Sequence, residues 1–210
     1  MQTQTKIIAL VGMTGSGKSV ASDALIDAGC AYVRFGQITI DTIQERGLPV
    51  TPETEKSVRE ELRNTHGMGA FATLNIPKFD KALAEGKHLV ADGLYSWTEY
   101  KILKDYYGER LTVFAIYASP ATRYARLEKR MTVANDTAVK NRPLTALQAH
   151  ARDFAEIENI EKGGPIVMAD YTIVNEGLTI EELKTKVHTI FNQLAMEGVS
   201  PDALTAEKQP

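Results

Sequence analysis

The sequence predicts a three-layer α/β fold, in which helices cover both faces of a parallel β-sheet. Five short apolar runs alternate with longer amphipathic segments, which is the order expected when helices join parallel strands. The 210 residues are 43% hydrophobic and 24% charged, as in ordinary globular domains of a size that buries a core. We therefore expect one domain over residues 1–197 and a flexible polar tail over 198–210.

The five apolar runs are short and rich in β-branched or aromatic residues, as buried parallel strands are. They are Lys6–Val11, Ala31–Phe35, His88–Ala91, Leu111–Ala118 and Tyr171–Val174. Helix-start signals stand between the runs. Thr51 and Ser119 each precede a proline, and Ser96 and Thr179 each stand three residues before a glutamate, as in a capping box. Helices are therefore expected to begin at these four positions.

Charge and cysteine content exclude several classes of function. With 24 basic and 27 acidic residues the net charge is -3, so no overall positive field attracts nucleic acid or anionic lipid. Cys30 is the single cysteine, and the four histidines show no zinc-site spacing. The chain also shows no signal-peptide pattern and no run of 18 apolar residues. We expect a cytoplasmic monomer or homodimer without membrane or nucleic-acid partners.

A phosphate-binding motif follows the first predicted strand. Residues 12–19 read GMTGSGKS and fit the pattern G-x-x-x-x-G-K-[ST] of the P-loop, between a strand and a helix. Glycines there let main-chain amides turn inward around phosphate oxygens at a helix N-terminus. Lys18 adds a positive charge at the β- and γ-phosphates, and Ser19 can place its hydroxyl on Mg²⁺. The predicted nucleotide-binding residues here are Gly12, Met13, Thr14, Gly15, Ser16, Gly17, Lys18, Ser19 and Val20.

The third apolar run ends in an acidic residue. Asp92 follows the run HLVA and precedes Gly93, as expected of a Walker-B-like carboxylate that orients the magnesium shell. The alternative is a turn-forming Asp-Gly pair without a role in binding. The sequence contains no N-K-x-D motif to read guanine, which disfavours a Ras-like GTPase. We predict Ser19 and Asp92 as the metal-binding pair, and Asp92 also as a catalytic residue.

Arginines follow the fourth apolar run at helical spacing. Arg123, Arg126 and Arg130 stand at i, i+3 and i+7, which aligns three guanidinium groups along one stripe of a helix. Arginines stabilise the charge that develops on a transferred phosphoryl group, so Arg126 and Arg130 are predicted catalytic residues with Lys18. The alternative is a solvated basic face. Arg142 extends the basic series into residues 131–143, a segment predicted to close as a lid and exclude water.

A predicted helix over residues 52–66 lies in a region that could bind the phosphate acceptor. Arg59 and Arg63 stand one turn apart on it and could clamp an acceptor phosphate, whereas the alternative pairs Arg59 with Glu55. Arg34 flanks the same region. Tyr95, just beyond the third run, either stacks on a base or packs at a helix start.

The chain resembles the adenylate-kinase-like branch of P-loop kinases, which includes nucleoside monophosphate kinases and dephospho-CoA kinase. Within it the resemblance is to an archaeal and bacterial group often labelled dephospho-CoA kinase-like. Its motifs are GMTGSGKS, RGLPVTPE, LRNTHGMGAFA, ADGLYS, ASPATRYARLEKR and ADYTIVNEG. The resemblance implies a P-loop NTPase fold with a five-stranded parallel sheet, and ATP with Mg²⁺ as donor. It also implies an acceptor-binding helical region over about 36–86, the lid over 131–143, and Asn175 beside the adenine.

One departure from the family bears on the acceptor. Relatives often carry an acid after the glycine that follows the second strand, where this chain has Gln37. An alcohol acceptor benefits from a carboxylate that takes its proton, whereas a phosphate acceptor needs neutralising cations. We therefore expect a kinase acting on a nucleotide-like small molecule, a nucleoside monophosphate first. Dephospho-CoA is the runner-up, with Asp41 as a possible base, and an ATP-binding regulatory switch with slow hydrolysis is a further alternative.

Overall fold

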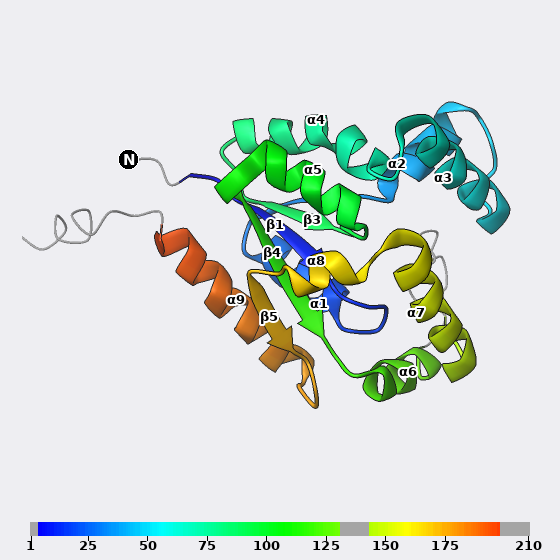
Figure 1. Cartoon of the computed structure of the whole chain (residues 1–210). Helices are drawn as coiled ribbons and strands as arrows, with labels where there is room; N and C mark the ends of the chain where they lie inside the picture. Colours follow the sequence, from blue (N-terminus) through cyan, green and yellow to red (C-terminus); the bar gives the residue numbers. More distant parts are fainter. Residues whose placement is uncertain (1–3, 131–142, 198–210) are drawn as a thin grey trace, which may run out of the picture.

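The computed structural model describes residues 4–130 and 143–197, and its centre is the expected parallel sheet (Figure 1). All strand pairs are parallel, and the strand order is β2-β3-β1-β4-β5. The strands are β1 Ile7–Val11, β2 Ala31–Arg34, β3 Leu89–Asp92, β4 Leu111–Tyr117 and β5 Tyr171–Val174. This confirms the predicted fold class, and the predicted strand bounds differ from the observed ones by no more than one residue at either end.

Helices cover both faces of the sheet (Figure 1). Helices α4 and α5 lie on one face and α1 and α9 on the other, where α1 and α9 also pack together. The helical elements are α1 Lys18–Asp27, α2 Gln37–Glu45, α3 Pro52–His66, α4 Ala70–Ala84, α5 Trp97–Tyr107, the 3₁₀ turn η1 Gly108–Arg110, α6 Pro120–Glu128, α7 Ala146–Ile160, α8 Gly163–Val167 and α9 Ile180–Glu197. The helix predicted over residues 52–66 is α3.

Strand β1 shows why the sheet is covered on both sides. Its side chains alternate between two hydrophobic cores: Ile7 and Val11 pack with residues of α4 and α5, and Ile8 and Leu10 pack with residues of α1 and α9. All five residues of β1 are buried, as the continuous apolar run predicts for a strand between two helical layers.

The four predicted helix starts are confirmed. The hydroxyls of Thr51, Ser96 and Ser119 accept the backbone N–H of the third helical residue, and Ser96 forms a full capping box with Glu99. Thr179 precedes α9 and its hydroxyl accepts the N–H of Glu182. These bonds satisfy amide groups that the first turn of a helix leaves without partners.

The carboxyl ends of the parallel strands meet at one edge, where β1 leads into the P-loop, β2 into α2 and β3 into the loop before α5. Ligands of open parallel sheets bind at this edge. The predicted lid, apart from Pro143, and the predicted tail lie outside the described residues. Within the residues that are described, no helix combines the length and the apolar character needed to cross a membrane.

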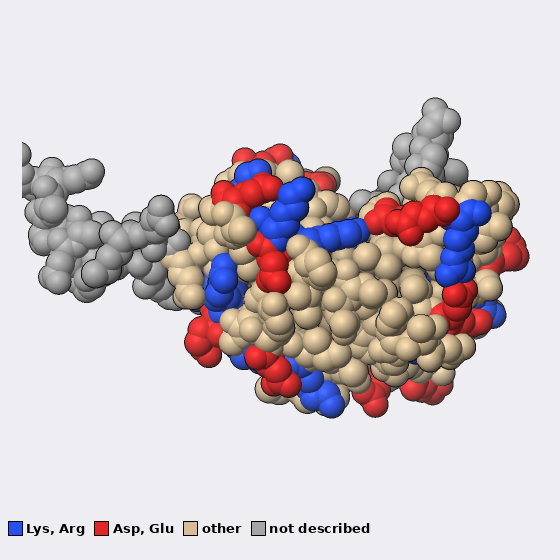
Figure 2. All heavy atoms as spheres, turned by 90° about the horizontal axis from the view of Figure 1, so that it is seen from above, with Lys and Arg blue, Asp and Glu red and all other residues tan. Residues whose placement is uncertain are grey.

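Figure 2 shows one helical face of the molecule, seen from above the view of Figure 1. Basic and acidic side chains are interspersed around a broad area without charge, and the face carries no large patch of one sign. This distribution agrees with the near-balance of charges in the sequence.

Candidate functional site

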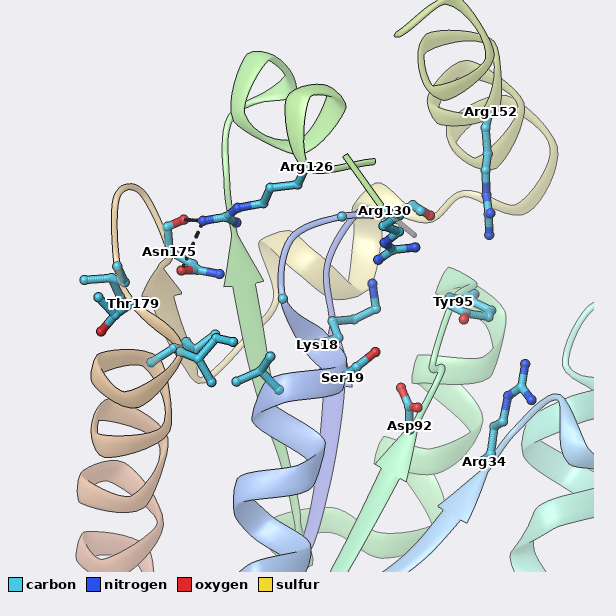
Figure 3. Close-up of a pocket in the computed structure, with 17 residues that line it drawn as sticks. Lys18, Ser19, Arg34, Asp92, Tyr95, Arg126, Arg130, Arg152, Asn175 and Thr179 are labelled. Atoms are coloured by element: carbon cyan, nitrogen blue, oxygen red, sulfur yellow. Dashed lines mark hydrogen bonds between the residues drawn. The ribbon is translucent and has the colours of Figure 1, made fainter. Parts of the chain in front are cut away.

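A pocket of about 500 Å³ opens at the carboxyl edge of the sheet (Figure 3). Side chains from six separate parts of the chain meet in it. Lys18 and Ser19 come from the start of α1, Asp92 and Tyr95 from the end of β3 and the loop beyond it. The other charged contributors are Arg34 at the end of β2, Arg126 of α6, Arg130 just after α6 and Arg152 of α7, and Asn175 and Thr179 come from the segment after β5.

The P-loop needs glycine at two positions, because a side chain at each would collide with a different neighbour. Gly12 has φ 139°, and a Cβ there would lie 2.3 Å from the carbonyl oxygen of Ile116 in β4. Gly17 has φ 111°, and a Cβ there would lie 2.4 Å from Nδ2 of Asn175. The loop is therefore wedged between β4 and the segment that follows β5. Only a residue without a side chain permits both the left-handed backbone and the close contact.

Most of the predicted nucleotide-binding residues line the pocket, and the rest support the loop. Thr14, Gly15, Gly17, Lys18, Ser19 and Val20 line it. Gly12 and Met13 do not, but their carbonyl oxygens accept hydrogen bonds from Lys18 Nζ, at 2.8 and 3.1 Å. Ser16 is buried, and its carbonyl accepts the Nδ2–H of Asn175 at 2.7 Å. Asn175 thus fastens the P-loop as well as lining the pocket.

Lys18 is held in an environment that disfavours its charge. Burial, with the neighbouring charge of Lys162, lowers the pKa of its ammonium to about 7, against the opposing effect of Asp92. Figure 3 shows the side chain pointing into the pocket toward Arg130. The negative charge of a bound phosphate would stabilise the charged form of Lys18. The P-loop therefore favours binding of an anion beside this lysine.

Ser19 and Asp92 both line the pocket, and each has an oxygen atom that can bind a metal ion. Asp92 accepts a hydrogen bond from the Tyr32 hydroxyl at 3.0 Å, which orients its carboxylate. A hydroxyl and a carboxylate suit Mg²⁺, which keeps several waters and shares its remaining positions with phosphates. The described residues contain no cluster of three or more acidic, histidine or cysteine ligands, so phosphate oxygens would have to complete this site.

The three arginines around α6 do not form the single stripe that their spacing predicts. Arg126 and Arg130 line the pocket, and Arg126 donates to the carbonyl oxygen of Asn175 at 2.9 Å (Figure 3). Arg123 is 4% exposed and makes a bidentate pair with Asp153 of α7, at 2.9 and 2.6 Å. Its guanidinium also donates to the carbonyl of Thr14 at 3.1 Å. The Asp153 carboxylate balances the charge of this buried guanidinium. Through its bond to Thr14, Arg123 stabilises the P-loop and does not line the pocket.

A buried cluster beside the pocket has no counterpart in the predicted site. Glu156 of α7 accepts hydrogen bonds from Arg152 at 2.9 Å, from Lys162, and from the Thr14 hydroxyl at 3.5 Å. Lys162 is 2% exposed, and its ammonium lies 4.5 Å from the ring centre of Tyr95. These neighbouring cations hold the pKa of Glu156 below its usual range, against the opposing effect of burial. The sequence gives no signal for Lys162, because the residues next to it in the chain form no pattern that predicts a buried lysine.

The predicted acceptor residues separate into two groups. Arg34, Arg59 and Tyr95 line a second hollow of about 170 Å³, which shares Arg34, Asp92, Tyr95 and Arg152 with the main pocket. Arg59 also pairs with Glu55 at 3.3 Å, which is the alternative that the sequence offered to an acceptor-phosphate clamp. Its place in the lining of the hollow agrees with the clamp, so each interpretation accounts for part of its surroundings. Two predicted residues line neither space. Gln37 donates to Asp41 at 3.0 Å, and the guanidinium of Arg63 lies 5.3 Å from the ring centre of Phe71.

Two further expectations concern residues outside these spaces. Asp41, considered as a base, lines neither space and pairs with Lys78 at 2.8 Å, which with Gln37 holds its pKa below the usual range although burial opposes the shift. Arg142, expected in the lid, lies outside the described residues.

Comparisons with known proteins show the family of the chain. Residues 8–143 match a family model described as an AAA domain. The UPF0200 protein of Thermococcus sibiricus is 32% identical over 192 residues, covering 91% of this chain and 96% of the relative. That of Pyrococcus furiosus is 33% identical over 189 residues, covering 90% and 97%.

Solved structures of low sequence identity share the fold. A shikimate kinase from Bacteroides thetaiotaomicron superposes with a TM-score of 0.54 at 12% identity, covering 89% of this chain and 98% of that one. A gluconokinase from Sinorhizobium meliloti superposes with a TM-score of 0.51 at 13% identity, covering 94% and 97%. The chain therefore has the fold of P-loop small-molecule kinases.

Proposed function

The chain belongs to the AAA-domain family that its sequence matches and to the UPF0200 family, and from this premise we propose that it is an ATP-dependent kinase. Its acceptor is a small nucleotide-like molecule, a nucleoside monophosphate first. One observation carries the proposal. The P-loop lysine, an oxygen pair suited to Mg²⁺ and four arginines line one pocket, and that pocket shares Arg34, Asp92, Tyr95 and Arg152 with a second hollow.

The donor nucleotide would lie along the P-loop. The loop amides and Lys18 would hold the β- and γ-phosphates, because both present positive charge into the pocket at the N-terminus of α1. Asn175 and Arg126, which hydrogen-bond to each other at the opposite side of the pocket, would border the adenine. Ser19 and Asp92 would hold Mg²⁺, which when bound neutralises charge on the phosphates.

The transferred phosphoryl group would lie where the two spaces meet. Arg130 lines the nucleotide pocket and Arg152 lines both spaces, so these two guanidinium groups are placed to stabilise the charge of the transition state. We propose Arg142 for the same role from the lid. A phosphate acceptor needs cations more than a base, and the hollow is lined by three arginines, Arg34, Arg59 and Arg152, and by two carboxylates, Glu55 and Asp92.

A hydroxyl acceptor, as in dephospho-CoA phosphorylation, is favoured by one observation. Asp92 lines both spaces, so its carboxylate could take a proton from an acceptor hydroxyl in the hollow. An acceptor screen separates the two chemistries. A nucleoside monophosphate gains its phosphoryl group on a phosphate, whereas dephospho-CoA gains it on the ribose.

The test is acceptor-dependent ADP formation in the wild-type protein and in Lys18→Ala, with ATP and Mg²⁺. A kinase forms ADP at a rate that rises sharply with one acceptor, and Lys18→Ala should lose this activity while its circular dichroism and melting transition persist. ADP formation indifferent to every acceptor would identify an ATP-dependent switch instead. Wild-type turnover in Lys18→Ala would reject the assignment of the P-loop.

A further inference from the structure

Two buried charges of opposite sign lie beside the nucleotide pocket without lining it. The Glu156 side chain of α7 is 14% exposed, the Lys162 side chain just before α8 is 2% exposed, and the two form an ion pair. A buried ion pair adds little net stability, because the desolvation of both charges offsets their attraction. It does fix the position of each group, since a group that left its partner would leave a buried charge uncompensated.

The backbone between α7 and α8 directs Lys162 back onto Glu156. Glu161 caps the end of α7, and its φ of 53° is the only positive value among the described residues other than glycine. The Lys162 N–H then donates to the carbonyl oxygen of Glu156 at 3.3 Å, as in a helix C-cap. Helix α8 in turn packs closely on α5, because a Cβ at Gly164 would lie 2.9 Å from the Trp97 ring. Lys162 is therefore held in place by both of its neighbouring elements.

The two carboxylate oxygens of Glu156 have different cationic partners. Oε1 accepts the Nε–H of Arg152 at 2.9 Å, and Oε2 accepts a hydrogen bond from the Lys162 ammonium. The buried arginine of α6 shows the other arrangement, since Arg123 binds both oxygens of Asp153 through its two terminal nitrogens. Lys162 therefore occupies the oxygen that Arg152 would need for such a bidentate pair.

Arg152 consequently keeps its terminal nitrogens for a ligand. Its side chain is 51% exposed and extends from α7 to line both the nucleotide pocket and the hollow (Figure 3). Within the described residues, the bond to Glu156 is the only hydrogen bond of this side chain, and it uses Nε alone. The N–H donors on the two terminal nitrogens of the guanidinium group remain available to phosphate oxygens.

We propose that Lys162 is a positioning residue for the γ-phosphate: it engages one oxygen of Glu156, so that Glu156 holds Arg152 by Nε and leaves its terminal nitrogens to the phosphate. This inference rests on the proposed function for the place of the γ-phosphate, where the two spaces meet. Without the Lys162 ammonium, Arg152 would pair with both oxygens of Glu156 and withdraw from the pocket. Lys162 itself does not reach the ligand, because its ammonium lies between Glu156 and the ring of Tyr95, 4.5 Å from the ring centre.

This role concerns the third phosphate of the nucleotide. Lys18 and the loop amides would hold the phosphates that lie along the P-loop, whereas Arg152 would reach the γ-phosphate alone, because it stands at the junction with the hollow. Loss of Lys162 should therefore weaken the binding of ATP and affect ADP much less. Damage to the fold or to the P-loop would instead weaken the binding of both nucleotides together.

The test is calorimetric titration of the full chain with ATP and with ADP, each in the presence of Mg²⁺. Lys162→Met should raise the dissociation constant for ATP about tenfold, as expected for one charge-assisted contact, and that for ADP much less. Two double variants then separate position from charge. Each combines Lys162→Met with a neutral residue at position 156, so that both have the net charge of the wild type and neither leaves a buried charge of this pair uncompensated.

The two double variants differ only in what they offer to Arg152. Glu156→Gln with Lys162→Met keeps an acceptor oxygen for the Arg152 Nε–H and should restore most of the affinity for ATP. Glu156→Met with Lys162→Met offers no acceptor and should leave ATP binding about tenfold weaker than in the wild type. Lys78→Met is the control, because Lys78 pairs with Asp41 outside both spaces, and it should leave both constants unchanged. Melting curves confirm that each variant is folded, and if Lys162→Met does not fold, the two double variants decide.

Each other result overturns the proposal. An unchanged ATP constant in Lys162→Met would remove its role, and equal ATP affinities in the two double variants would show that net charge matters and position does not. A loss of ADP affinity as large as that of ATP would make the role structural. A wild type that binds ATP no more tightly than ADP would also reject the proposal, and one that binds neither nucleotide would reject the assignment of the P-loop with it. The proposed function fails separately: if the affinities follow the expected pattern while no acceptor is phosphorylated, Lys162 keeps its role and the kinase assignment does not stand.

Discussion

At the scale of single residues, identical side chains have different roles because their burial differs. Arg123 is 4% exposed and is satisfied by Asp153, Thr14 and Ala118, whereas Arg126 and Arg130 reach the pocket. Lys18 and Lys162 differ in the same way. Lys18 lines the pocket, and Lys162 is enclosed with Glu156, where burial holds the pKa of its own ammonium below the usual range. Charge patterns in a sequence do not reveal this difference.

The Arg123–Asp153 pair predicts a large stability effect. Arg123→Met should lower the free energy of unfolding by about 3–5 kcal/mol, because it leaves the Asp153 carboxylate buried without its partner. The double variant Arg123→Met, Asp153→Leu should recover much of that loss, since neither charge remains. Urea unfolding measures both. Arg46→Met is the control, because its pair with Glu61 is about half exposed and is worth at most about 1 kcal/mol. Equal losses in Arg123→Met and Arg46→Met would contradict this account.

At the scale of elements, the P-loop depends on neighbours that are distant in sequence. Asn175, after the last strand, bonds Ser16 in the loop and accepts from Arg126 of α6. Arg123 of α6 bonds both the loop and α7. The conformation of the loop is therefore maintained by β4, α6 and the segment after β5 together. A change at any of these contacts should appear first as weaker nucleotide binding.

Gly17→Ala tests this dependence. A Cβ at position 17 would meet Asn175 Nδ2 at 2.4 Å and would require φ 111°, so the variant should lose ATP affinity by at least tenfold and melt at a lower temperature. Calorimetric titration and thermal melting are the two measurements. Gly47→Ala is the matched control. It also has a positive φ, 66°, but nothing lies within 4 Å, so it should cost only about 1 kcal/mol and leave ATP affinity intact. ATP binding by Gly17→Ala at wild-type strength would show that the close packing is unimportant.

At the scale of the whole molecule, the sequence predicts the fold far better than the site. Alternation of apolar runs and capping residues places the strands and several helix starts, because these signals are local. The P-loop motif is also a local signal, and it predicts correctly that residues of this loop line the pocket. Glu156 and Lys162 could not be predicted, because their roles depend on how α7 and α8 return to the P-loop.

The central claim is that one open pocket receives a magnesium triphosphate through the main chain of the P-loop. Calorimetric titration of the full chain with ATP in the presence of Mg²⁺ tests it most directly, with Lys18→Ala measured in parallel. We predict saturable binding of one ATP per chain to the wild type and binding weakened by at least tenfold in the variant. A folded wild-type protein that releases no heat on addition of ATP or GTP, and whose melting temperature neither nucleotide raises, would contradict the account.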